Sequence, residues 1–177
     1  SEHPRARVLA IHTDEAADMP GVVRILTADD IPGERVLGLY AKDWPVYIKV
    51  GEVTRYIGDA LACVVAETEA EARAAAACVK VDYEVLTPLL DMEEAETSPI
   101  HIHENGNILL DKSIRRGEPV DEALARCAFT AEATYRTQAV EHAFIEPEAT
   151  LAVPEAGGVR LYVQSQGIWH DKTDIAA

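Results

Sequence analysis

Residues 60–85 constrain the fold of this chain most strongly, because the sequence pattern changes twice within them. They open with ALACVVA, a continuous apolar run that suits a strand covered on both faces. Thr68 and Glu71 follow at the three-residue spacing of a helix capping box, and the alanine-rich segment after them favours a helix. The stretch ends with VKVDYEV, whose alternation is typical of a strand with one solvent-facing side. The sequence therefore predicts a strand, a helix and a strand in succession.

Weaker patterns of both kinds surround this unit. Further strands are predicted from alternating or β-branched runs at 6–11, 22–26, 46–50, 53–57, 129–140, 149–153 and 159–165. Further helices are predicted at 14–18 and 120–127. Residues 168–177 show the start of a helical pattern. Because strands and helices are interspersed without strict alternation, the fold class expected is α+β.

A long polar connection separates the two halves of the sequence. Residues 88–107 contain two prolines, a glycine and a run of acidic side chains, a composition typical of a surface connection. A domain boundary is expected within this connection or just after it. The predicted organisation is a first domain at residues 1–110 and a second segment at residues 111–177.

The charge balance excludes two classes of partner. Sixteen basic residues stand against 31 acidic ones, which gives a net charge of −15 and a pI near 4.7. Nucleic-acid binding needs a basic face, and an anionic membrane surface repels an acidic protein. No apolar run approaches the ~18 residues that a membrane span requires. We therefore expect no nucleic acid and no membrane as partner.

The cysteines indicate a reducing compartment. The sequence has three, none of them in a CxxC spacing, so no iron–sulfur cluster of the chain's own is expected. Cys63 and Cys78 lie in apolar segments and are predicted to be small buried side chains. The location expected from this usage is cytoplasmic.

Two pairs of side chains are candidates for a metal or an acid–base site. His101 and His103 could bind a metal, but such a site needs three or four ligands, so exposed loop histidines are the preferred interpretation. His142 next to Glu141 could form an acid–base pair. Neighbours on a strand point to opposite faces, however, which argues against a shared proton.

A third pair, Glu146 and Glu148, has the spacing that places two carboxylates on one strand face. Paired carboxylates can perform general acid–base hydrolysis. Pro147 between them indicates an edge or a bend, so two solvated acids are the preferred interpretation, with a carboxylate-based hydrolase as the alternative.

Gln166 follows an apolar strand pattern directly, within Ser165-Gln166-Gly167. A glutamine amide at a strand end can donate a hydrogen bond to an oxo or carbonyl ligand. Taken alone, it is interpreted as an ordinary loop glutamine. The sequence has no GxGxxG, P-loop, GxSxG or HExxH motif.

Four blocks of sequence, in order, resemble the xanthine dehydrogenase and aldehyde oxidase family. The blocks at 3–33 and 51–86 (GEVTRYIGDALACVVAETEAEARAAAACVKVDYEVL) resemble its α/β-hammerhead domain. YRTQAVEHAFIEPEATLAVP at 135–154 and VRLYVQSQGIWHD at 159–171 are similar to the beginning of its molybdopterin-binding region. Trp44-Pro45 and the last two blocks look closest to bacterial purine-type enzymes sometimes called selenium-dependent molybdenum hydroxylases.

The resemblance implies a reaction and its cofactors. In this family a pterin-held molybdenum centre hydroxylates a purine, another N-heterocycle or an aldehyde with water as the oxygen source. Electrons leave through iron–sulfur clusters and FAD on other domains or subunits. Gln166 matches the family glutamine whose amide sits against an oxo group of the molybdenum. The chain departs from the family pattern at Ser165, where many members have threonine, and at Ile168-Trp169.

The resemblance also implies that this chain corresponds to one part of the family's larger molybdenum-binding subunit. The family's pterin-gripping loops and its general-base glutamate lie downstream of the region matched, so we expect a fragment that is inactive alone and binds no cofactor. Residues 1–110 are expected to dock against the rest of the molybdenum-binding subunit and the iron–sulfur and FAD subunits. The expected substrates are xanthine-like N-heterocycles. The alternatives are aldehydes, carbon monoxide, or a docking module without chemistry.

Overall fold

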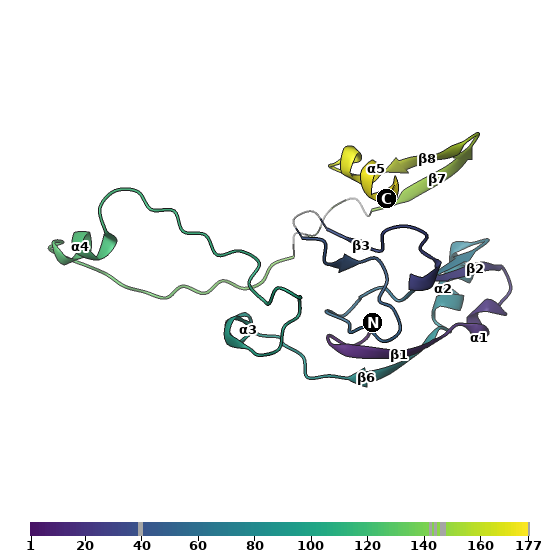
Figure 1. Ribbon diagram of the computed structural model, residues 1–177, viewed down its shortest axis with the longest axis horizontal. Coiled ribbons are helices and arrows are strands. Elements are labelled where there is room, and N and C mark those ends of the chain that lie inside the picture. Colours follow the sequence, from purple (N-terminus) through teal and green to yellow (C-terminus); the bar gives the residue numbers. More distant parts are fainter. Residues whose placement is uncertain (39–40, 142, 144, 146–147, 177) are drawn as a thin grey trace. The chain divides into compact units, whose positions relative to one another are not determined.

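The computed structural model describes residues 1–38, 41–141, 143, 145 and 148–176 (Figure 1). The chain divides into two compact units. The first comprises Ser1–Leu109 and the residues from Thr173 onward, and the second comprises Leu110–Lys172. Both units mix helices and strands, and the expected α+β class is confirmed. The predicted boundary between hammerhead and molybdopterin-binding domains at residue 110 stays a prediction.

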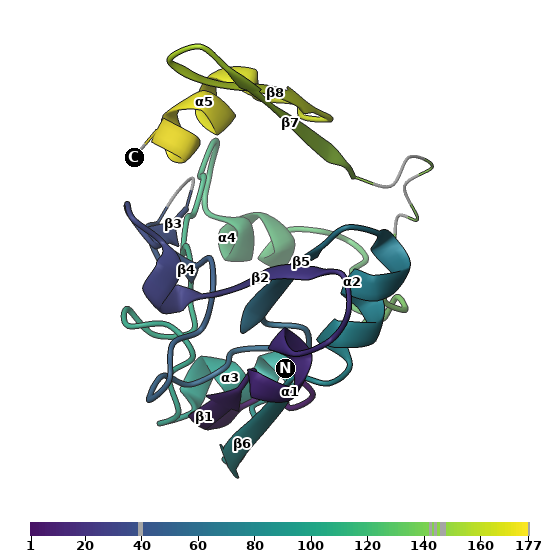
Figure 2. The same ribbon diagram turned by 90° about the vertical axis from the view of Figure 1, so that its right-hand side faces the viewer.

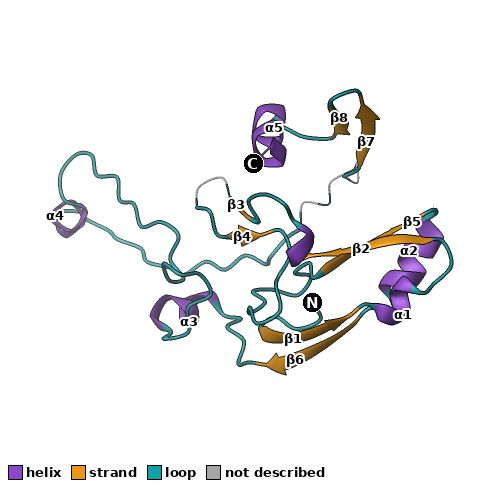
Figure 3. Ribbon diagram, turned by 45° about the vertical axis from the view of Figure 1, so that its right-hand side comes forward, coloured by secondary structure: helices purple, strands orange, loops and turns teal. Residues whose placement is uncertain are grey.

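Two antiparallel strand pairs form the frame of the first unit. β1 (Ala6–His12) pairs with β6 (Lys80–Val85), and β2 (Val22–Thr27) pairs with β5 (Ala62–Ala66) (Figure 3). Each pair joins strands that are far apart in the sequence. The predicted strand–helix–strand succession is present, but its two strands belong to different pairs.

Short elements connect these pairs. They are α1 (Asp14–Ala17), the 3₁₀ helix η1 (Ala28–Asp30), β3 (Val36–Leu37), β4 (Trp44–Pro45), α2 (Glu69–Ala76) and α3 (Met92–Thr97). α2 contacts β5 and β2, as Figure 2 shows. Its start is fixed by Thr68, whose hydroxyl oxygen accepts the Glu71 N–H at 3.3 Å and donates to Glu71 Oε2 at 2.7 Å. Among the described residues, only half of the predicted capping box is observed: the Thr68 oxygen caps the Glu71 N–H, but the Glu71 carboxylate accepts the Thr68 hydroxyl in place of the Thr68 backbone N–H.

The core of the first unit lies between β1 and the segment that follows β4. Val8, Ile48 and Leu61 are buried against one another. Residues 51–54 line the free edge of β1, where Thr54 Oγ1 accepts the Ala6 N–H at 2.9 Å and Thr54 N–H donates to the Ala6 carbonyl at 2.8 Å. Both the burial of apolar side chains and the hydrogen bonding of buried polar groups therefore stabilise the packing of this segment against β1.

The strands predicted at 46–50 and 53–57 are wrong. These residues form turns and a single bridge between Arg7 and Val53. Gly51 has φ +95°, a left-handed conformation that reverses the chain before a ladder can extend. The connection at 88–107 holds one unpredicted helix, α3, whose first amides donate to the Asp91 carboxylate.

The second unit contains one helix, one hairpin and the start of another helix among its described residues. α4 (Val120–Ala125) follows Pro119 directly, and β7 (Thr150–Glu155) pairs with β8 (Gly158–Val163). Gly157, with φ +85°, makes the tight reversal between the two strands. α5 (Ile168–Ala176) comes after a four-residue loop. The predicted hairpin and both helices are confirmed.

The strand predicted at 129–140 is absent. The segment is exposed along its length, with Phe129 94% and Tyr135 88% accessible to solvent. The apolar–polar alternation that predicts a strand is present in the sequence, but a strand also needs an edge to pair with. No strand in the described part of the chain forms a backbone ladder with this segment.

The predicted burial of Cys63 and Cys78 is wrong. Cys63 is exposed and Cys78 is only half-buried. Within β5, the neighbouring Ala62 and Val64 line a cleft with α2, so Cys63 points to the opposite face because successive residues alternate. A continuous apolar run predicts two covered faces, and here only one is covered.

Candidate functional site

The loop between β8 and α5 holds the residue that the sequence singled out. β8 ends at Val163 and α5 begins at Ile168, so the loop consists of residues 164–167. Gly167 ends it, and its carbonyl accepts the N–H groups of His170 at 2.8 Å and Asp171 at 3.1 Å. These two bonds start the helix and fix where the loop stops.

Two of the three polar side chains in this loop serve the loop itself. Gln164 Oε1 accepts the backbone N–H of Ala149 at 3.2 Å, which joins the end of β8 to the residue before β7. Ser165 Oγ accepts the backbone N–H of Gly167 at 2.9 Å. Gln166, between them, is exposed, and no group among the described residues hydrogen-bonds to its amide. Its NH₂ donors are therefore available to an external acceptor.

The first turn of α5 carries further unusual groups. Trp169 is 75% exposed, and the Lys172 ammonium lies 5.7 Å from its ring centroid. One carboxylate oxygen of Asp171, Oδ2, is buried without a hydrogen-bond partner among the described residues. An unpaired buried acceptor favours a donor from another group. This helix start thus offers both a free amide donor and an unpaired acceptor.

The other predicted candidates are not brought together into a site. His101 and His103 are both exposed, as expected for loop histidines, and His103 Nδ1 lies 2.6 Å from Asp43 Oδ2. His142 and Glu146 lie outside the described residues, so the pairs proposed with Glu141 and Glu148 are untested. Within the described ranges, no group of three potential metal-ligating side chains forms.

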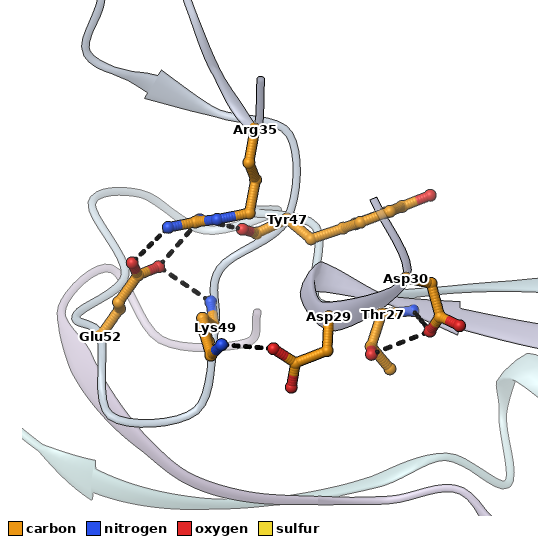
Figure 4. Close-up of polar contacts among 7 residues, drawn as sticks. All are labelled: Thr27, Asp29, Asp30, Arg35, Tyr47, Lys49 and Glu52. Carbon is orange, nitrogen blue, oxygen red and sulfur yellow. Dashed lines mark hydrogen bonds and ion pairs between the residues drawn. The ribbon is translucent and has the colours of Figure 1, made fainter. Parts of the chain in front are cut away.

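A polar cluster in the first unit was not foreseen from the sequence (Figure 4). Arg35 Nη2 and Nη1 contact the two Glu52 carboxylate oxygens at 2.5 and 3.0 Å, and Nη1 also donates to the Tyr47 carbonyl at 2.7 Å. Glu52 accepts the Lys49 backbone N–H at 2.9 Å, and the Lys49 ammonium pairs with Asp29. The cluster ties the loop after β4 to η1 and to the residue before β3, which is a structural task.

Two titratable groups beside this cluster have shifted pKa values. The Thr27 backbone N–H, followed by Arg24, lowers the pKa of Asp30 from its ordinary value. Burial, followed by the neighbouring Cys63 thiol, raises the pKa of the Tyr47 hydroxyl. The Asp30 shift follows from the local turn at Thr27, and the Tyr47 shift follows mainly from burial.

A cleft of about 640 Å³ lies between the two strand pairs of the first unit. Its walls are small or branched apolar side chains from β5, α2 and β6, with Asp59, Lys80 and Tyr83 among the polar groups. Lys80 is already paired with Glu15 at 2.5 Å. The cleft offers space, but more of its accessible wall is polar than apolar, and it holds no cluster of reactive groups.

Comparison with known proteins gives matches along nearly the whole chain. The family model described as "Aldehyde oxidase and xanthine dehydrogenase, a/b hammerhead domain" matches residues 1–87. The family model described as "Molybdopterin cofactor-binding domain" matches residues 100–177. The second match includes the loop that carries Gln166.

Individual relatives agree with these matches. A probable xanthine dehydrogenase subunit of Bacillus subtilis is 34% identical over 99% of this chain and 24% of its own length. The nicotinate dehydrogenase large molybdopterin subunit of Eubacterium barkeri is 34% identical over 98% of this chain and 40% of its own. The solved aldehyde oxidoreductase of Desulfovibrio gigas superposes with a TM-score of 0.84 at 29% identity, over 93% of this chain and 19% of that chain. The chain thus spans less than half the length of each of these relatives.

Proposed function

This chain belongs to the xanthine dehydrogenase and aldehyde oxidase family of molybdenum hydroxylases, and we propose that it serves an enzyme that oxidises a purine or a related N-heterocycle. Its residues match the family's hammerhead and molybdopterin-binding domains in the family's order. Two relatives at 34% identity are named for xanthine and nicotinate, both N-heterocycles. These names support the substrate class proposed.

The observation that carries the proposal is the exposed, unengaged amide of Gln166 in the part of the chain that matches a molybdopterin-binding domain. A bound molybdenum centre supplies the chemistry that replaces a substrate C–H by C–OH, with oxygen from water and release of two electrons and two protons. Gln166 is proposed to donate a hydrogen bond from its Nε2 to an oxygen of that centre, which would orient and polarise it. The loop fits this role because the neighbouring Gln164 and Ser165 are already engaged.

The remainder of the chain is proposed to dock. Residues 1–110 would form the hammerhead domain and contact the rest of the molybdenum-binding subunit and partners that carry iron–sulfur clusters and FAD. Residues 111–177 would be the beginning of the molybdopterin-binding domain. Large apolar side chains such as Ile114, Phe129 and Tyr135 are 87–94% exposed, and such surfaces mark contacts with other protein. We therefore propose that the chain alone is inactive.

The cellular location proposed is the cytoplasm. All three cysteines are free thiols, as expected in a reducing compartment. Among the described helices, none has both the length and the apolar character needed to cross a bilayer.

Turnover by the complete enzyme containing this chain tests the proposal. Xanthine, nicotinate, aldehydes and carbon monoxide are supplied in turn, with an artificial electron acceptor and with molybdenum content measured on the same sample. Turnover of xanthine or nicotinate is expected. Turnover of aldehydes or carbon monoxide alone would show that the proposed class of N-heterocyclic substrates is wrong. No turnover of any substrate at full molybdenum content would favour a docking module. Stoichiometric molybdenum in the isolated chain would contradict its proposed inability to bind cofactor alone.

A further inference from the structure

The backbone around Gln166 is held from both sides. On its C-terminal side, the Gly167 carbonyl accepts the N–H groups of His170 and Asp171 in the first turn of α5. On its N-terminal side, the Ser165 hydroxyl oxygen receives the Gly167 N–H at 2.9 Å. The second bond spans Gln166, so it closes a turn with Gln166 at its apex.

A bond from a serine oxygen to the N–H two residues on restricts the backbone of the residue between them. This restriction has particular weight here because the next residue is glycine, the most conformationally free of the amino acids. Without the Ser165 oxygen, residues 166 and 167 could adopt other conformations while α5 stayed intact. The direction of the Gln166 Cα–Cβ bond, and with it the position of the side-chain amide, would then be less well fixed.

We propose that Ser165 is a positioning residue, whose hydroxyl holds the turn from which Gln166 presents its amide. The inference rests on the proposed role of Gln166 towards the molybdenum centre, but the bond itself is present without any cofactor. Gln164 has a separate task, since it ties the loop to Ala149. The loop therefore divides its three polar side chains into two that shape it and one that acts outward.

The first test is amide hydrogen exchange at Gly167 in the chain of residues 1–177. Ser165→Ala is expected to speed exchange about three- to tenfold, the range for one exposed hydrogen bond. Ser165→Thr keeps the oxygen and should exchange like the unchanged chain. Ser113→Ala is the matched control, since Ser113 is an exposed serine of the same unit with no partner among the described residues. Unchanged exchange in Ser165→Ala overturns the proposal.

The second test uses the complete enzyme and separates this inference from the proposed function. Ser165→Ala is expected to lower kcat several-fold at constant KM and molybdenum content and to broaden the Mo(V) EPR signal, with both restored in Ser165→Thr. If Gln166→Ala slows turnover but Ser165→Ala does not, the positioning role is overturned and the proposed function stands. If Ser165→Ala speeds exchange at Gly167 but Gln166→Ala leaves turnover unchanged, the turn is confirmed. The proposed hydrogen bond from Gln166 to the molybdenum centre is then overturned.

Discussion

The carboxylate of Glu71 lies against the backbone of Gly21, where a side chain of any kind would overlap it. Gly21 has φ +78°, in the left-handed region, and its carbonyl accepts the Glu67 N–H at 2.8 Å. Glu71 is held in this place by the hydroxyl of Thr68. The turn before β2 and the start of α2 are therefore built around the same carboxylate.

Gly21→Ala is predicted to lower the free energy of unfolding by about 2–3 kcal/mol. The left-handed backbone costs about 1–2 kcal/mol for alanine. Moving the Glu71 carboxylate aside also breaks its hydrogen bond with the Thr68 hydroxyl, which contributes about 1 kcal/mol more. Gly157→Ala is the control, because Gly157 has φ +85° with open space around it. Chemical denaturation of both variants measures the difference, and equal losses would contradict the overlap.

Thr68→Ala is predicted to destabilise the protein by about 1 kcal/mol, because α2 loses its N-terminal cap. Thr13 provides a matched control. It occupies the same position before α1 but makes no side-chain cap bond, so Thr13→Ala should change the unfolding free energy by only a few tenths of a kcal/mol. Thermal unfolding compares the two. A loss at Thr68 no greater than that at Thr13 would contradict the contribution of the cap bond.

Glu52→Gln is predicted to cost about 1–3 kcal/mol, since it weakens two charge-assisted contacts to Arg35, whose side chain is only 21% exposed. Glu84→Gln is the control. Glu84 makes one contact of 3.2 Å to Arg7, both side chains are about half exposed, and its loss should cost at most about 0.5 kcal/mol. Denaturant midpoints measure both. Similar losses would mean that the partial burial of Arg35 does not strengthen its pair.

Stability at low pH is predicted to depend on Asp30. Its pKa is lowered in the folded state by the Thr27 N–H and by Arg24, so its carboxylate stabilises the fold above the ordinary value of 3.8. That contribution is lost as the pH falls below 3.8 and through the folded-state pKa. Asp30→Asn should therefore be less stable than the unchanged protein at pH 7, with the difference shrinking in acid. Unfolding curves from pH 7 to pH 2 measure it, and a difference independent of pH would contradict the assignment.

Local sequence patterns predict the elements well but not their partners. The apolar run, the capping box and the alternation at 60–85 predict β5, α2 and β6 at nearly their observed bounds. The pairing of β1 with β6 and of β2 with β5 depends on contacts between distant residues, which periodicity does not encode. The segment at 129–140 shows the converse, because its strand pattern has no partner edge to pair with among the residues that the structure describes.

The candidate site was only partly accessible from the sequence. Gln166 was identified through resemblance, since nothing local distinguishes it from a loop glutamine. The bond from Ser165 to Gly167 follows a known serine turn pattern and could have been predicted from the sequence. Arg35 and Glu52 could not, because no periodicity links residues so far apart in irregular segments.

The turnover number of Gln166→Ala in the complete enzyme tests the central claim most directly. Removing a hydrogen bond to a group around a metal typically costs about 10- to 100-fold in activity, so kcat should fall by that factor. KM, molybdenum content and melting temperature should stay unchanged. Gln138→Ala, at an exposed glutamine of the same unit, should behave like the unchanged enzyme. An unchanged kcat in Gln166→Ala at full molybdenum content would show that this amide does not act on the molybdenum centre.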